Sequence, residues 1–317
     1  MDNGLEFEIS NDFIIYYNVP TYSSKNEKLD KNKILMPSHI IGSVIQKIVE
    51  YDMFNRLEHF SSKIITSIKN TVSKNAKDKY FWLSNAFELK CVVETIHSKE
   101  NKLREKKDAE IVLNVLNNLN DLIKEIYDKI WKSLHNHIIK KAKLEMIQDN
   151  DNTKDIFYYL SSANKKFKYF YIEDSIGTQT FDRCIELIYK SWLNNYNEKK
   201  RNIIGGNLIN NQWLKELFES YYKQIVKQNK LKLESWCNKN NISDNIKWHI
   251  KLLNATSMNN SYYSTDDNDL INSFNELRIN EDATTSKFEI PKYKEVKKLK
   301  VSGVPDSAFL TSSLFEV

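Results

Sequence analysis

The sequence has very few of the residues that form tight turns. Only 6 glycines and 4 prolines occur among its 317 residues. A β-rich fold needs many turns, and turns prefer these two residues, so their scarcity favours helices joined by loops rich in Asn, Asp and Ser. The sequence therefore predicts an all-α protein, and its length is enough for a large core or for two lobes.

Cysteines and long apolar segments are scarce as well. Cys91, Cys184 and Cys237 lie far apart in the sequence. An odd number without a Cys-x-x-Cys spacing argues against a disulfide framework or a zinc site and fits a reducing compartment. No apolar run approaches the roughly 18 residues of a membrane span, and the N-terminus lacks the basic and apolar regions of a signal peptide. We therefore expect a cytoplasmic protein that does not insert directly into a membrane.

The positive charge is in mild excess and is spread along the chain. There are 47 Lys and Arg residues against 42 Asp and Glu residues, which gives a formal net charge of +5. The densest basic stretch, residues 292–300, is interrupted by Glu295. Proteins that bind nucleic acids concentrate their basic residues on one face or stripe. The sequence therefore predicts no nucleic-acid partner.

The common catalytic and cofactor-binding motifs are also absent. The sequence has no phosphate-binding loop, no dinucleotide-binding glycine pattern, and neither His-Glu-x-x-His nor Gly-x-Ser-x-Gly. His135 and His137 are two residues apart in a helical pattern, so they point to different faces and cannot easily share a metal ion. A reactive thiol needs a basic or helix-N-terminal setting, whereas Cys237 lies near the end of a predicted helix, so it is expected to be a buried structural residue. We therefore predict no catalytic residue, no metal and no cofactor, and expect that the protein is not an enzyme.

Apolar residues recur at steps of three and four in several segments, which indicates amphipathic helices. Pro37 suits the first turn of one such helix, where its missing N–H is not needed. The pattern predicts helices at about residues 37–49, 57–72, 79–97, 108–148, 179–197, 209–228, 230–240, 244–256 and 266–278.

The longest pattern, residues 108–148, contains no Gly or Pro. A helix of that length would extend roughly 60 Å, more than the width of one compact domain. A free coiled coil is the alternative, but the apolar stripe is wider than a coiled-coil seam. From residue 281 on, apolar residues alternate with charged ones, as in an extended segment.

These patterns predict an elongated, two-lobed helical bundle with a long central helix and an extended C-terminal strap. The predicted domains are an N-terminal segment (1–36), a first helical lobe with the central helix (37–148), a second lobe (149–280) and a C-terminal tail (281–317).

Several stretches occur in the same order as in a known family. They read YFWLSNAFELKCVV (80–93), MPSHIIGSVIQKIVEYDMFNRLEHFSSKIITSIKNTV (36–72), LNDLIKEIYDKIW (119–131), LESWCNKNNISDN (233–245) and YYSTDDNDLI (262–271). Together they resemble the dilute domain, the cargo-binding globular tail of class V myosins, in its fungal form. Each stretch is weakly specific alone, and the shared order makes the set more specific.

The resemblance implies a non-catalytic module that binds cargo or adaptor proteins. Such a module links organelles or vesicles to actin-based transport, so its partners would be organelle or vesicle adaptors. The sequence does not distinguish an excised myosin tail from a stand-alone protein. A stand-alone helical scaffold or a subunit of a tethering complex in membrane traffic is therefore the alternative.

The resemblance also implies positions for two partner sites. An adaptor-binding patch on the long helix corresponds to Asn118, Leu122, Glu125 and Asp128, whose spacing places them on one helix face. The alternative is an ordinary solvated face with Leu122 in the core. Rab-type GTPases are the second implied partner, but Gln228, Gln224 and Tyr262 stand where the fungal tails use Tyr, Leu and Lys.

The aromatic stretch has an unusual polar insert, because Phe81, Trp82 and Leu83 are followed at once by Ser84 and Asn85. In the resembling family this helix organises the core. Trp82 would then fill a gap between helices and need a partner for its indole N–H. Ser84 and Asn85 would be buried hydrogen-bonding residues that fix one helix against another. Trp236, in the stretch LESWC, is expected to be a core residue too.

Overall fold

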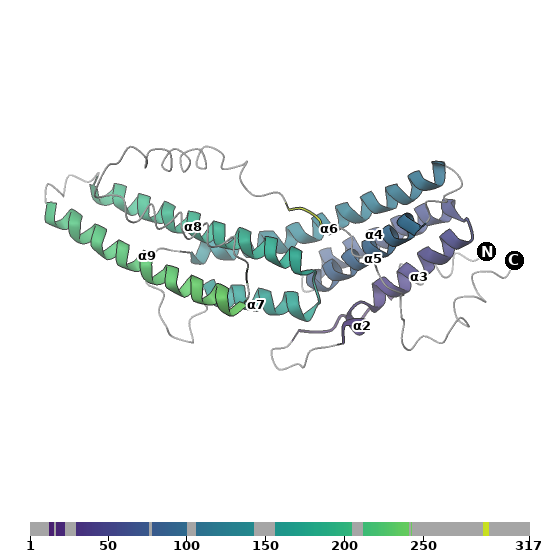
Figure 1. Cartoon of the computed structure of the whole chain (residues 1–317), viewed down its shortest axis with the longest axis horizontal. Coiled ribbons are helices and arrows are strands. Elements are labelled where there is room, and N and C mark those ends of the chain that lie inside the picture. The colour runs from purple at the N-terminus through teal and green to yellow at the C-terminus, as the bar shows by residue number, and fades with distance from the viewer. Residues whose placement is uncertain are drawn as a thin grey trace. The chain divides into compact units, whose positions relative to one another are not determined.

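The structure, a computed structural model, describes residues 13–15, 17–22, 30–75, 78–99, 106–142, 156–204, 212–240, 242 and 288–291. These residues contain helices and no strand (Figure 1). The prediction of an all-α protein is therefore confirmed. The helices are α2 (Lys31–Ile34), α3 (Met36–Glu50), α4 (Phe54–Lys74), α5 (Lys79–Lys99), α6 (Lys106–Lys141), α7 (Ile156–Tyr169), α8 (Asp174–Ile204) and α9 (Gln212–Asn240).

α3, α4 and α5 begin and end within three residues of the predicted positions, whereas α6 begins near the predicted residue 108 but ends at Lys141, before the predicted residue 148. Pro37 lies at the start of α3, as expected, and its side chain is buried. α6 is the longest helix, with 36 residues, which corresponds to about 54 Å. The apolar repeat at steps of three and four therefore identified α3, α4, α5 and α6 correctly.

The second half differs from the sequence prediction in two places. α7 was not predicted, although its buried residues Ile156, Leu160, Ala163 and Phe167 follow one another at steps of four, three and four. α9 is one helix of 29 residues, where the sequence suggested two helices meeting near residue 229. Asn229 is fully buried within α9, so a polar residue in the apolar stripe was mistaken for a break.

The chain divides into two compact units. The first comprises Met1–Trp131, Lys165–Ile176 and Glu289–Val317, and the second comprises Lys132–Asn164 and Gly177–Phe288. α6, α7 and α8 each contribute residues to both units. The domain boundaries suggested by the sequence stay a prediction.

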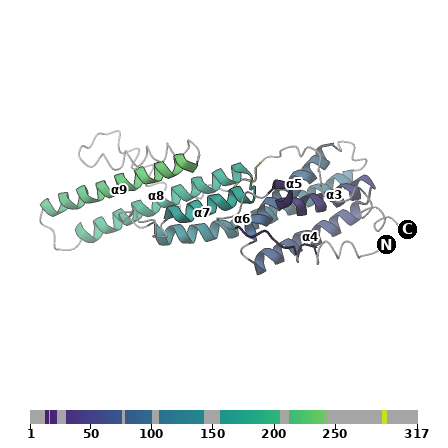
Figure 2. The same ribbon diagram turned by 90° about the horizontal axis from the view of Figure 1, so that it is seen from below.

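The first unit is built around the contact of α3 with α5, and α4 packs beside them (Figures 1 and 2). Gly42 of α3 lets the two helices approach closely, because a Cβ there would lie 2.9 Å from Cγ1 of Val92. Such a distance is shorter than carbon atoms normally tolerate. The absence of a side chain at position 42 therefore sets the spacing of this helix pair.

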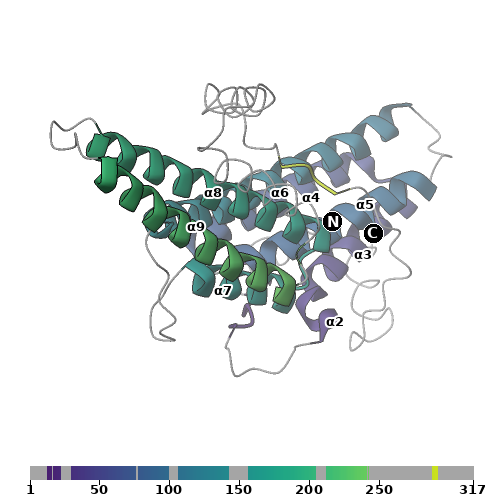
Figure 3. The same cartoon turned by 60° about the vertical axis from the view of Figure 1, so that its left-hand side comes forward.

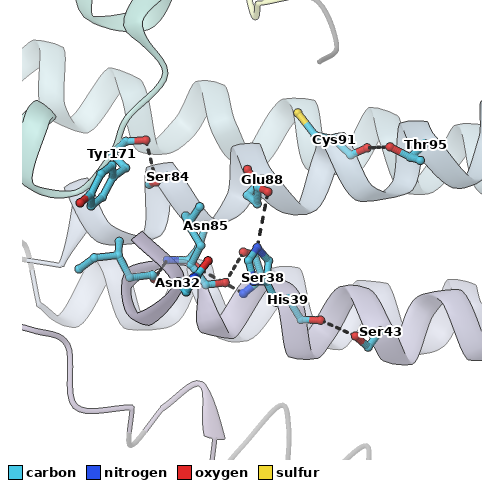
Figure 4. A network of polar contacts seen from close by, with 12 residues as sticks. Asn32, Ser38, His39, Ser43, Ser84, Asn85, Glu88, Cys91, Thr95 and Tyr171 are labelled. Atoms are coloured by element: carbon cyan, nitrogen blue, oxygen red, sulfur yellow. Dashed lines mark hydrogen bonds and ion pairs between the residues drawn. The ribbon is translucent and has the colours of Figure 1, made fainter. Parts of the chain in front are cut away.

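Asn85 of α5 connects the junction of α2 and α3 to the core (Figure 4). Its Oδ1 accepts a hydrogen bond from the Ser38 backbone N–H at 3.1 Å. Its Nδ2 donates to the backbone carbonyls of Ile34 and Phe81, each at 3.0 Å. Leu35, the N-cap residue of α3, provides no side-chain cap, so Asn85 supplies from another helix the acceptor that the N-terminus of α3 needs.

The aromatic residues of α5 lie at the centre of the first unit. Trp82, Phe81 and Leu83 are fully buried, and the ring of Phe81 packs edge-on against Trp82 with centroids 5.2 Å apart. Ser84 is buried and donates a hydrogen bond to the carbonyl of Tyr171 at 3.3 Å. The expectation for the Trp82 indole is wrong, because its N–H has no acceptor among the described residues.

The second unit is held together around Trp236 of α9. Its indole N–H donates to Ser161 Oγ of α7 at 2.8 Å, and its ring packs against Phe181 of α8 with centroids 5.9 Å apart. α8 and α9 run side by side in this unit (Figure 3). Asn164 of α7 donates to Asn240 Oδ1 at 2.7 Å and adds a second link between α7 and α9.

Some predicted elements lie outside the described residues. These are the helices predicted at about 244–256 and 266–278 and most of the strap at 281–317. Within the strap, residues 288–291 are described and have no regular secondary structure. None of the described helices combines the length and apolar composition that a membrane span requires.

Candidate partner-binding surface

The four residues predicted for adaptor binding all lie on α6, in the part that belongs to the first unit. Asn118 and Asp128 are exposed, and the Glu125 side chain is 39% exposed. These three residues can therefore be reached by another protein, and we call them the α6 rim.

Leu122 does not belong to that surface. Its exposed fraction is 0%, because it faces the core of the first unit together with Leu119, Ile123 and Ile126. A partner cannot contact this side chain while α6 keeps its packing. Of the two readings that the sequence allowed, the one that places Leu122 in the core describes its position. The prediction that all four side chains form one accessible patch is corrected on this point.

Glu125 is the centre of a charged cluster between α4 and α6. One carboxylate oxygen lies 3.0 Å from Nζ of Lys69 on α4, and the other lies 3.1 Å from Nζ of Lys129. Lys129 also donates a hydrogen bond to Ser73 Oγ at 3.0 Å. The hydrogen bond from Lys69 is the largest cause that lowers the pKa of Glu125, burial acts in the opposite direction, and Lys129 lowers the pKa further. Glu125 is therefore ionised and tied to α4 near neutral pH.

A second group of cations at the start of α5 was missed by the sequence reasoning. The ammonium groups of Lys79 and Lys166 lie 5.7 Å and 5.5 Å from the centroid of the Tyr80 ring. Lys79 also donates to the backbone carbonyl of Lys129 at 3.4 Å, which places this group next to the Glu125 cluster. Lys166 belongs to α7, the helix that was not predicted, so its position beside Tyr80 could not be inferred.

The two cysteines of the second unit are buried, which makes their thiols poor nucleophiles. Burial, together with the charges of Asp182 and Glu234, raises the pKa of the Cys237 thiol to about 12. Burial also raises the pKa of Cys184, and Arg183 opposes this effect. The His137 ring stacks on Tyr159 at 4.6 Å. In the part of the chain that the structure describes, no group of three or more His, Cys, Asp or Glu could hold a metal ion.

The residues at the predicted Rab position are only partly described. Gln224 is exposed and Gln228 is half-buried on α9. Tyr262 lies outside the described residues.

Comparison with known proteins gives matches among solved structures only. No family model matches the chain, and no curated protein matches it either. The structure of Myo2-GTD in complex with Mmr1 is 20% identical, with a TM-score of 0.59 over 85% of this chain and 70% of that chain. Myo2-GTD in complex with Smy1 is 18% identical, with a TM-score of 0.57 over 94% of this chain and 88% of that chain.

A third match is the yeast myosin 5 cargo-binding domain, which is 18% identical with a TM-score of 0.55 over 85% of this chain and 70% of that chain. This chain therefore has the fold of the myosin V cargo-binding globular tail. The family resemblance read from the sequence is confirmed at the level of the fold.

Proposed function

We propose that this chain is a non-catalytic module that binds adaptor proteins of organelles or vesicles and links them to actin-based transport. The observation that carries the proposal is the fold, because similar Myo2-GTD structures were solved in complex with other proteins, Mmr1 and Smy1. The module would act in the cytoplasm, on the actin cytoskeleton. We do not extend the proposal to Rab-type GTPases, because Gln224 and Gln228 replace the residues that resembling tails use.

We propose the α6 rim as the contact surface for an adaptor. Asn118, Glu125 and Asp128 are accessible polar residues on one side of a long, firmly packed helix. A rigid helix face suits the recognition of a short helix or an extended peptide. Asp128 is the most useful probe, because it is exposed and no hydrogen bond or ion pair to another described residue would be lost with it.

The test is affinity capture with the purified chain, followed by identification of the captured proteins. Asp128→Lys should lose at least one organelle or vesicle protein that the parent chain captures. Glu58→Lys, the same charge reversal at an exposed position on α4, should keep the full set. A parent chain that captures no such protein, or an Asp128→Lys variant that captures the same set, would contradict the proposal.

A further inference from the structure

Lys79 and Lys166 both lie beside the ring of Tyr80, which is an unusual environment for two cations. Tyr80 itself is only 7% exposed, and its ring also contacts Phe167 edge-on with centroids 5.7 Å apart. The ammonium groups of Lys79 and Lys166 both lie within cation–π distance of this ring. We call these two residues the Tyr80 lysine pair. A buried aromatic ring with two cations beside it is a local concentration of positive charge inside a partly water-excluded site.

No described acid neutralises this pair. Glu125, the carboxylate of the neighbouring cluster, bonds to Lys69 and Lys129 instead. Neither Lys79 nor Lys166 has an ion pair with any residue that the structure describes, and the only hydrogen bond of the two is from Lys79 to a backbone carbonyl. Among the described residues, Lys69 and Lys129 therefore have a carboxylate partner in Glu125, and Lys79 and Lys166 have none.

Both ammonium groups are half-buried, and this burial works against their charge. Burial lowers the pKa of Lys79, and repulsion by Lys166 lowers it further. Burial also lowers the pKa of Lys166. Two cations held close together without a counter-ion destabilise a fold, and such local conflicts often mark functional sites.

We propose that the Tyr80 lysine pair binds an acidic peptide segment of the adaptor protein that docks on the α6 rim. A carboxylate side chain supplies the counter-ion that the pair lacks, and the shared neighbour Lys129 joins the pair to Glu125 of the rim. The proposal places one extended segment across both, with its acidic residue at the pair. This inference rests on the proposed function, because it names the chemistry of the adaptor's docking segment.

The test uses a fluorescein-labelled peptide of alternating Glu and Ala, with a peptide of alternating Gln and Ala as the neutral probe. Binding to the full chain is followed by fluorescence anisotropy. The Glu peptide should bind, and the Gln peptide should not. Lys79→Gln and Lys166→Gln should each weaken binding about fivefold or more, because each removes one partly desolvated charge from the contact.

Two further variants separate a specific contact from general attraction. Lys124→Gln removes the same charge from an exposed position on α6 and should change binding less than about twofold. Lys166→Arg keeps the charge and should bind much as the parent does. Circular dichroism melts of all variants show whether any loss of binding reflects unfolding.

Several results would overturn the inference. They are no binding of the Glu peptide, an equal loss with Lys124→Gln, or binding of inorganic phosphate to the pair without binding of the Glu peptide. The outcomes also separate this inference from the proposed function. If the chain binds the peptide through the lysine pair but captures no adaptor, only the proposed function is contradicted. If Asp128→Lys loses adaptors but the parent chain does not bind the peptide, only this inference is contradicted.

Discussion

At the scale of single residues, one amide side chain joins three segments of the first unit. Asn85 accepts from Ser38 and donates to Ile34 and Phe81, and it is only 2% exposed. All three partner groups belong to the backbone, so none of them can turn away to find another partner. The polar insert after Trp82 is therefore a structural joint between α5 and the start of α3.

Replacing this amide should be costly. Asn85→Ala leaves the Ser38 N–H and the Ile34 carbonyl buried without a partner, and we expect a loss of about 2–4 kcal/mol in the free energy of unfolding. Urea denaturation measures the change. Asn118→Ala, at an exposed position, should stay within about 0.5 kcal/mol of the parent. A variant at position 85 with the parent's stability would show that these bonds do not hold the junction.

In the Tyr80 lysine pair, a substitution should raise the free energy of unfolding instead of lowering it. Lys166→Met removes a half-buried charge that has no acid partner among the described residues, so it should stabilise the protein at neutral pH, by less than about 1 kcal/mol because solvent screens the charge. The pKa of folded Lys166 lies below its ordinary value of 10.5, so the penalty is present below the folded pKa and disappears as the pH rises toward 10.5.

Thermal melts at neutral and at alkaline pH measure this gain. It should be visible at neutral pH and should shrink as the pH approaches 10.5. Lys124→Met, on the exposed side of α6, serves as the control for the change in net charge. A destabilised Lys166→Met variant would indicate that the cation is already neutralised in the free protein.

At the scale of helices, the contact of α3 with α5 depends on the glycine at position 42. Gly42→Ala would normally stabilise a helix by about 1 kcal/mol. Here the new methyl group would overlap Val92, and overpacking of this kind costs about 1–3 kcal/mol. We expect a net loss of about 1 kcal/mol in chemical denaturation.

A double variant tests whether the overlap is the cause. Val92→Ala makes room for the methyl group, so adding Gly42→Ala to that variant should cost nothing or should be stabilising. A Gly42→Ala substitution that stabilises the parent chain would contradict the close approach of α3 and α5.

The ion pair between Glu125 and Lys69, which links α4 to α6, should weaken at low pH. The hydrogen bond from Lys69 holds the pKa of Glu125 below its ordinary value of 4.5, so its stabilising effect is present above pH 4.5 and is lost as the pH falls through the lower, folded value. Glu125→Gln should lower stability at neutral pH by less than about 1 kcal/mol, because the pair is partly exposed.

The difference between Glu125→Gln and the parent should vanish in acid. Denaturant titrations of both proteins at neutral pH and below pH 4 or so measure it. Glu58→Gln, at an exposed position on α4, is the matched control. A difference that stays constant with pH would mean that the charge of Glu125 does not connect the two helices.

The helix assignments show where sequence reasoning works. α3 to α6 were predictable because their apolar residues repeat over many turns, and periodicity is most reliable in long segments. α7 has 14 residues with aromatic and Lys side chains mixed into its stripe, which weakens the repeat. In α9 the buried Asn229 interrupts the apolar pattern without interrupting the helix.

At the scale of the whole molecule, the fold was predictable and the details of the site were not. The scarcity of Gly and Pro and the order of the resembling stretches pointed to an all-α myosin V tail fold, which the solved structures confirm. Residue spacing along α6 could not show that Leu122 faces the core. The Tyr80 lysine pair joins residues 87 positions apart, from 79 to 166, and only tertiary structure brings them together.

The central claim is that another protein binds this chain at the α6 rim. Placing a photo-crosslinking amino acid at position 128 and irradiating cells tests the claim most directly, with position 58 on α4 as the reference. We expect a covalent adduct at position 128 with an organelle or vesicle adaptor, and none with that protein at position 58. Adducts that are the same at both positions, or absent from position 128, would contradict it.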